Sequence, residues 1–199
     1  MPGFDAIIGQ PRPIRILTRL LARGILPHAL LFTGMEGVGK KTTAAAVIMA
    51  CNCLGSSEAE DDGRGRMTPG AGGCGTCAAC RKIAAGSHPD LRRLAPAGGM
   101  IKIEPIRELC AFLNMKPFEA RMRAVVITDA QALNPAAGNA LLKMLEEPPP
   151  QTVMILTTAQ AADVLPTIVS RCRQIHFAPL VRRDVAAILM RDHEQDPAT

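Results

Sequence analysis

Apolar residues along this chain follow two kinds of spacing. Residues 12–23 carry leucine and isoleucine at helical intervals with arginines between them, which predicts an amphipathic helix. Uninterrupted apolar runs at 28–34, 124–128 and 152–158 are typical of buried strands in a parallel sheet. Shorter strands are expected within 89–96 and at 174–177.

Helical patterns fill the segments between these strands. Helices are predicted at 42–53, 103–117 and 134–147, with a short helix ending near Ser170 and another at 182–192. In the third, Asn134 is a candidate N-cap, Pro135 the first helical residue, and Pro148 the stop. Because strands alternate with helices, the pattern predicts an α/β fold built on a parallel sheet.

The first strand is followed by a glycine-rich loop, GMEGVGKKTT, at residues 34–43. A strand, such a loop and a helix, in that order, are typical of a phosphate-binding site. Three glycines permit a tight wrap around phosphate, and Lys40 can reach the phosphate oxygens; the glycines are Gly34, Gly37 and Gly39. The next position normally supplies a hydroxyl to Mg²⁺ but here is Lys41, and Thr42 lies about 100° further round the helix.

Composition narrows the function without deciding it. The chain has 199 residues, a formal charge of +5, no Trp or Tyr and only five Phe. A single-strand binder that stacks bases on aromatic side chains is therefore disfavoured, and any DNA contact should be to phosphates. No apolar run long enough for a membrane span and no signal peptide is found, so a cytoplasmic protein is expected.

Three cysteines with C-x2-C-x2-C spacing, Cys74, Cys77 and Cys80, predict a metal site. A tight loop can bring them to one zinc ion, which needs a fourth ligand and would be structural. An iron–sulfur cluster is disfavoured because no nearby fourth Cys followed by Pro completes the run. Residues 55–73 are predicted to be a flexible surface insertion, and two other cysteines, Cys110 and Cys172, are predicted to be buried thiols.

Six segments together carry a family resemblance: IIGQ, HALLFTGMEGVGK, the cysteine motif, HPDL, NALLKMLEEPPP and PTIVSRC. Their order and spacing resemble the bacterial clamp-loader subunits, which are AAA+ proteins of the DNA polymerase III holoenzyme. The resemblance covers nearly the whole chain. Two kinds of subunit share the fold: the gamma/tau motor and delta prime, whose ATP site is degenerate. The segments HPDLRRLAP and ALNPAAGNALLKMLEEPPP look like delta prime.

The resemblance implies roles for residues around the loop. Counting back from NALLKMLEEPP places Thr128 where the family has its Mg²⁺-binding Asp, and Asp129 where it has a water-activating Glu. Together with Lys41, this alters both groups that would hold the metal, so ATP hydrolysis by this chain is not expected. Nucleotide binding stays open because the glycines and Lys40 are present. The sensor 1 position falls at Thr157 or Thr158.

The resemblance also implies a catalytic arginine and the fourth metal ligand. Arg171, in SRC, matches the trans-acting arginine finger that reaches a neighbouring subunit's γ-phosphate, whereas Arg173 is expected to be a solvated strand charge. In the family, the fourth zinc ligand comes from the end of the helix after the loop. That position is Cys53, with Cys51 as the alternative.

The expected organisation is an AAA+ domain over 1–177 with a zinc module at about 53–80, then the start of a lid domain at 178–199 that this chain does not complete. The expected function is that of a delta prime subunit. Its partners would be gamma/tau, delta, the sliding clamp and primed DNA, with this fragment alone a monomer. The alternatives are an ATP-hydrolysing gamma/tau-type motor and a free-standing zinc-containing DNA-binding module. Modest charge and scarce aromatic residues count against the last.

Overall fold

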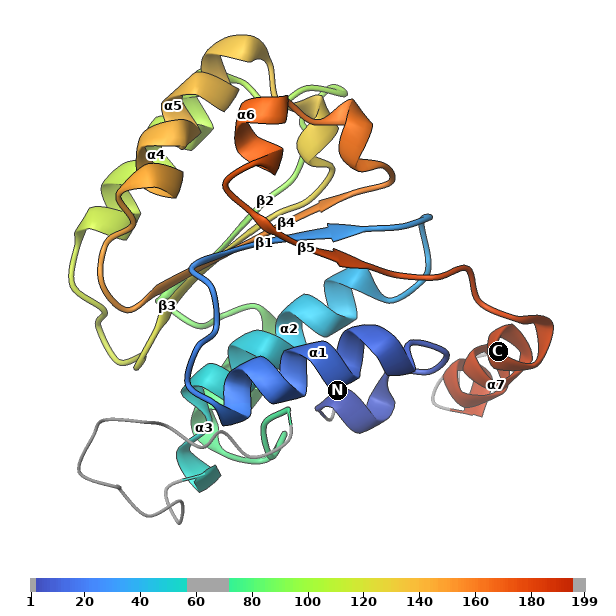
Figure 1. Cartoon of the computed structure of the whole chain (residues 1–199). Helices are drawn as coiled ribbons and strands as arrows, with labels where there is room; N and C mark the ends of the chain where they lie inside the picture. Colours follow the sequence, from blue (N-terminus) through green and yellow to red (C-terminus); the bar gives the residue numbers. More distant parts are fainter. Residues whose placement is uncertain (1–2, 57–71, 195–199) are drawn as a thin grey trace.

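The computed structural model describes residues 3–56 and 72–194, so most of the predicted insertion at 55–73 lies outside the described residues. A five-stranded sheet with the order β2-β3-β4-β1-β5 forms the centre of the molecule (Figure 1), and every neighbouring pair is parallel. Its strands are β1 (Ala29–Thr33), β2 (Leu91–Leu94), β3 (Arg123–Ile127), β4 (Thr152–Thr158) and β5 (Arg173–His176). The predicted α/β fold with a parallel sheet is confirmed.

Helices cover both faces of this sheet. The α-helices are α1 (Pro11–Ala22), α2 (Lys40–Asn52), α3 (Ala78–Ala85), α4 (Ile103–Asn114), α5 (Pro135–Glu146), α6 (Pro166–Val169) and α7 (Arg182–Glu194). Short 3-10 turns occur at Phe4–Ala6, Leu54–Ser56, Ala130–Ala132 and Ala161–Asp163. Figure 1 shows α1, α2 and α3 on one side of the sheet and α4, α5 and α6 on the other.

Alternation along the strands divides the core between the two faces. In β1, Leu30 and Phe32 pack with α1 and α2, whereas Ala29 and Leu31 pack with α4 and α5. All five residues of β1 and all seven of β4 are buried, which is why these strands read as continuous apolar runs. No helix among the described residues is both long and apolar enough to cross a membrane.

Several helix ends follow local chemistry. The Asn134 side chain accepts a hydrogen bond from the Ala137 backbone N–H at 2.8 Å, which confirms it as the N-cap of α5. The helix predicted to start at Thr42 begins two residues earlier, at Lys40, with left-handed Gly39 as its N-cap. The cysteine motif was predicted to be a tight loop, but the structure differs at its end, because Cys80 lies within the short helix α3.

Two thiols were predicted to be buried and are only partly so. Cys110 and Cys172 both have intermediate exposure and pack at the margin of the core cluster on the α4 and α5 side. Cys110 lies in α4 beside its buried neighbours Leu109 and Leu113.

A pair of hydrogen bonds joins the segment before α1 to the segment after β5. The Gln10 side-chain amide donates to the Ala178 carbonyl at 2.7 Å and accepts from the Ala178 backbone N–H at 3.1 Å. Gln10 is buried, so both bonds are shielded from water. This side chain holds the segment before α1 against the segment that follows β5.

Candidate functional site

The glycine-rich loop leaves β1 at its carboxyl end and enters α2. Gly34, Gly37 and Gly39 all have positive φ, at 141°, 80° and 96° respectively. A Cβ on Gly34 would lie 2.5 Å from the Phe177 carbonyl oxygen, so this glycine also permits a close approach to the segment after β5. The loop therefore has the tight left-handed path that the glycines predict.

Lys40, the first residue of α2, folds back over the loop. Its ammonium donates hydrogen bonds to the carbonyls of Gly34 and Met35, the second at 2.7 Å. Burial lowers the pKa of the Lys40 ammonium below its ordinary value, and the nearby carboxylates of Asp129 and Glu36 oppose that shift. The lysine thus sits at the mouth of the loop with its donors directed toward the loop's own backbone.

A pocket of about 430 Å³ opens at the carboxyl ends of β1, β3 and β4. Its lining residues are Glu36, Gly37, Gly39, Lys40, Lys41, Thr42, Asp129, Gln131, Thr157 and Ala159. Seven of the predicted nucleotide-site residues are thus brought together, whereas Gly34 and Thr128 do not line the pocket. Sequence reasoning missed Glu36, Gln131 and Ala159, although each lies within three residues of a predicted position. This edge of a parallel sheet is where ligands of α/β proteins bind.

Lys41 and Thr128 occupy the two positions at which the resembled family holds Mg²⁺, and Asp129 follows directly. Lys41 is exposed and lines the pocket with its cationic side chain. The Thr128 hydroxyl donates to the Leu94 carbonyl on the neighbouring strand, at 3.3 Å. Asp129 has left-handed backbone geometry, and its N–H donates to the Thr157 hydroxyl at 3.4 Å. The lysines therefore share the pocket with two carboxylates, of Asp129 and Glu36, but neither Lys41 nor Thr128 supplies the oxygen ligand that Mg²⁺ has at its position.

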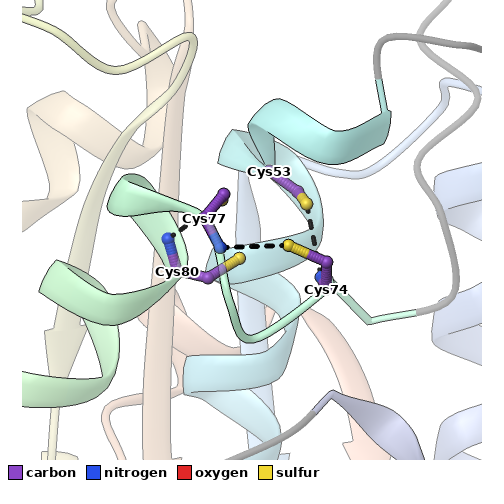
Figure 2. Close-up of side chains that lie close together, drawn as sticks. All are labelled: Cys53, Cys74, Cys77 and Cys80. Carbon is purple, nitrogen blue, oxygen red and sulfur yellow. Dashed lines mark hydrogen bonds between the residues drawn. The ribbon is translucent and has the colours of Figure 1, made fainter.

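Four cysteines form a second candidate site, beside the first turn of α3 (Figure 2). Cys53, Cys74, Cys77 and Cys80 place their sulfur atoms within 4.8 Å of one another. Tetrahedral zinc with Zn–S bonds of about 2.3 Å needs sulfur atoms about 3.8 Å apart, so a small contraction completes the geometry. Cys53 caps α2, whereas Cys51 is buried in the helix, where desolvation raises its thiol pKa to about 12.

Backbone donors point at the sulfur atoms of this cluster. The N–H groups of Cys74, Cys77 and Cys80 donate to the sulfurs of Cys53, Cys74 and Cys77 respectively, at 3.3 to 3.4 Å. Hydrogen bonds from the Thr76 side chain and from the backbone lower the pKa of the Cys74 thiol to about 5. Donors aimed at sulfur stabilise thiolates, which are the form that binds a metal. The donor set and its surroundings fit a closed, four-sulfur structural site.

Arg171 lies two residues after the last residue of α6, at the surface. Its guanidinium contacts the Glu146 carboxylate at 2.6 Å and donates to the Thr167 carbonyl at 2.9 Å. The two side chains of the ion pair are 36% and 49% exposed, so water screens their attraction. Arg171 is therefore tethered by one partly solvated ion pair, and Arg173 is exposed on β5 as predicted.

A buried ion pair gives a role to the HPDL motif, which the sequence marked only as a resemblance. The Asp90 carboxylate accepts three backbone N–H bonds at 2.8 Å, from Phe118, Glu119 and Ala120, and one from Arg123 at 3.0 Å. Arg123 also donates to the backbone carbonyl of Phe112, in the last turn of α4, and to two carbonyls of the turn between α4 and β3. Asp90 thus fastens the start of β2 to that turn and to β3.

The comparisons with known proteins agree with this arrangement. A family model described as DNA polymerase III, delta subunit, matches residues 9–181. The chain belongs to this family. Within this clamp-loader family, the delta' subunit of Bacillus subtilis (strain 168) is 34% identical over 171 residues, which cover 86% of this chain and 48% of that protein. The tau subunit of Escherichia coli (strain K12) is 32% identical over 194 residues, covering 96% of this chain and 28% of that protein.

The chain spans less than half the length of these relatives.

Solved structures agree on the fold. The gamma subunit-related protein of Thermotoga maritima has a TM-score of 0.54 at 21% identity, over 86% of this chain and 47% of that chain. The RuvB Holliday junction branch migration motor of Thermotoga maritima has a TM-score of 0.60 at 16% identity, over 98% of this chain and 54% of that chain. The predicted AAA+ fold is confirmed.

Proposed function

We propose that this chain is the AAA+ part of a delta prime-type clamp-loader subunit, which helps load a sliding clamp onto primed DNA and does not hydrolyse ATP itself. Its partners would be gamma/tau and delta subunits. The observation that carries this proposal is that both positions expected to hold Mg²⁺ in the pocket lack a suitable ligand. Lys41 lines the pocket, and the Thr128 hydroxyl is directed to a backbone carbonyl.

Hydrolysis of ATP by P-loop proteins depends on Mg²⁺ bridging the β- and γ-phosphates. The cation is normally held by a hydroxyl next to the loop lysine and by a carboxylate at the end of the neighbouring strand. In this chain the first position carries a cation, which repels Mg²⁺, and the second carries a neutral threonine. Asp129 and Glu36 remain at the pocket, but both carboxylates act on the Lys40 ammonium, and two lysines rather than a divalent ion offset their charge.

We expect the purified chain to show no Mg²⁺-dependent ATP turnover above background. The double substitution Lys41→Thr and Thr128→Asp should introduce Mg²⁺-dependent binding of a fluorescent ATP analogue, because it supplies both oxygen ligands. Lys41→Ala is the matched control, since it removes the cation without adding a ligand. Turnover by the unsubstituted chain at about 1 s⁻¹ or faster would favour the gamma/tau-type motor instead.

The four-cysteine cluster would hold structural zinc. Its ligands would be Cys53, Cys74, Cys77 and Cys80, and a four-sulfur shell leaves no open position for substrate. The bound ion would link the end of α2 to the start of α3 across the segment whose interior lies outside the described residues. Such an ion contributes folding free energy directly, because the unfolded chain does not preform the site.

We expect the purified chain to contain about one equivalent of zinc, measured by plasma mass spectrometry. Cys53→Ser should lower the content to below about half an equivalent, because three sulfur ligands hold the ion more weakly. Cys51→Ala is the matched control two residues earlier in the same helix, and it should keep the zinc. Iron in place of zinc, or equal loss from both variants, would contradict the assignment.

Arg171 would act as the arginine finger toward a neighbouring ATP site. Its support is a partly exposed position after α6 and a tether to Glu146 that is weak enough to be exchanged for phosphate. The helix α7 and the residues after it would begin the lid domain. These roles fit a subunit that contributes to ATP hydrolysis at the site of a neighbouring subunit rather than in its own pocket.

A further inference from the structure

One face of α1 carries a row of four arginines, namely Arg12, Arg15, Arg19 and Arg23, the last directly after the helix. With about 3.6 residues per turn, positions 3, 7 and 11 residues after Arg12 fall within an arc of about 80°. All four residues are exposed, whereas Pro13, Leu17 and Leu21 on the opposite face are buried. We call this set the α1 arginine row.

The charges of the α1 arginine row are not neutralised by the described part of the chain. The helix itself contains no Asp or Glu, and none of the ion pairs among residues 3–56 and 72–194 includes any of these arginines. Four like charges on neighbouring turns repel one another by a few tenths of a kcal/mol per pair. The helix dipole offsets part of this repulsion at Arg19 and Arg23, which lie at the carboxyl end of α1. Four exposed cations without carboxylate partners among the described residues form a surface that is complementary to an anionic partner.

The row continues into a second cationic surface. Arg12 lines a pocket of about 590 Å³ at the edge of the sheet, together with Arg173 and His176 of β5. Gln160 and Gln174 add polar side chains to the lining. The nucleotide pocket and Arg171 do not belong to this surface: of the lining residues, only Ala159 is common to both pockets. The cationic surface therefore extends from Arg23 along the whole helix to the β5 edge.

We propose that the α1 arginine row, with Arg173 at its end, binds the phosphate backbone of duplex DNA without regard to sequence. The row is about 16 Å long, with successive arginines about 4.5 to 6 Å apart along a rigid helix. A regular array of fixed guanidinium groups suits a regular array of phosphates, and arginine matches phosphate oxygens in a planar fork.

Duplex DNA fits this surface better than single-stranded nucleic acid. A single strand is held mainly by bases stacked on aromatic side chains. No aromatic residue occurs in α1, and no Phe lines the pocket at its end. The surface offers charge at regular intervals and nothing for a base to stack on, so the contact is with the backbone of a duplex. This inference rests on the proposed function and deepens it, because primed DNA contains a duplex. Its test needs no ATP and no partner subunit, so its failure is distinguishable from failure of the proposed function.

The test compares three variants of the chain by fluorescence anisotropy with a labelled 20-base-pair duplex. The first replaces the row by alanine (R12A, R15A, R19A, R23A), and the second replaces it by lysine. The third replaces four exposed cations elsewhere by alanine (R81A, K116A, R121A, R182A), so it lowers the formal charge of +5 by the same four units. Equal melting temperatures of all variants confirm that each is folded.

We expect the logarithm of the affinity of the unsubstituted chain to fall with the logarithm of salt concentration with a slope of about −3.6 or steeper. The alanine row variant should bind at least about tenfold more weakly at 50 mM salt, with a slope shallower by about 3 to 4. The lysine variant and the scattered variant should both retain most of the affinity and slope.

Equal losses in the row variant and the scattered variant would overturn the proposal, since binding would then follow net charge alone. Competition by a 20-residue polyglutamate peptide as effective as that by duplex DNA would also overturn it, in favour of an acidic protein segment. A single-stranded 20-mer that competes better than the duplex would overturn the choice of duplex.

Discussion

Replacing Arg171 with alanine is expected to lower ATP hydrolysis at the site it faces by about 10³-fold or more, in a clamp loader reconstituted with the full-length protein. An arginine that reaches the γ-phosphate stabilises charge that develops in the transition state, and alanine supplies none. Steady-state turnover of the whole assembly should fall by a smaller factor, because its other sites remain. Single-turnover measurements with one competent site isolate the effect.

Two further substitutions separate the finger from its local ion pair. Glu146→Gln frees Arg171 from its carboxylate at 2.6 Å but leaves the guanidinium, so turnover should stay near that of the unsubstituted assembly. Arg171→Lys keeps the charge but lacks the planar fork, so it should restore little. Gel filtration should show all three assemblies intact. Unchanged hydrolysis with Arg171→Ala would remove the finger assignment.

Replacing Asp90 with asparagine is expected to destabilise the chain by about 3–5 kcal/mol. The carboxylate receives four donors, and an amide NH₂ group would face one pair of them while the buried Arg123 lost its counter-ion. For a domain of this size, the loss corresponds to a melting temperature lower by about 10 °C in calorimetry. Glu119→Gln is the control, because its ion pair with Lys82 is at the surface and contributes less than about 1 kcal/mol.

The Asp90 carboxylate also makes the free energy of unfolding depend on pH. Burial opposes ionisation of Asp90, but the hydrogen bonds from the backbone and Arg123 outweigh it and lower its pKa from 3.8 to about 2. Because the folded-state pKa lies below the unfolded one, the stabilisation is complete above about pH 4 and is lost as the pH falls toward 2. Asp90→Asn should lack this step in urea unfolding between pH 2 and 4. A step of equal size in the variant would contradict this account.

The strands could be predicted from the sequence because burial on both faces leaves no polar interruption. The run TVMILTT matches β4 at both ends, and AVVIT differs from β3 by one residue. The first residue of β3, Arg123, is an exception, because it is a buried cation whose partners are Asp90 and backbone carbonyls within residues 112–116. A pattern of apolar positions holds no information about such a partner.

The candidate sites also differ in whether local sequence or tertiary packing brings their residues together. Contiguous motifs, such as the glycine loop and the cysteine triplet, could be predicted because their residues meet through local turns. Cys53 was reached through the family resemblance, and the sulfur distances agree with it over Cys51. The function of Asp90 could not be predicted, because the N–H groups it holds are 28 to 30 residues away and become neighbours only when β2 and β3 pair.

The paired hydrogen bond between Gln10 and Ala178 has a consequence for movement. It holds Ala178 in place much as a strand neighbour would, so the chain is anchored up to that residue. Any pivot of α7 relative to the sheet must then be made by the three residues between Ala178 and Arg182. On the other side of the joint, a Cβ at Gly9 would lie 2.7 Å from an Asp184 carboxylate oxygen, and Arg191 of α7 donates to the Ala6 carbonyl at 2.9 Å. A pivot that moves α7 away from this segment must therefore break the Arg191 hydrogen bond, and any side chain at position 9 would crowd α7.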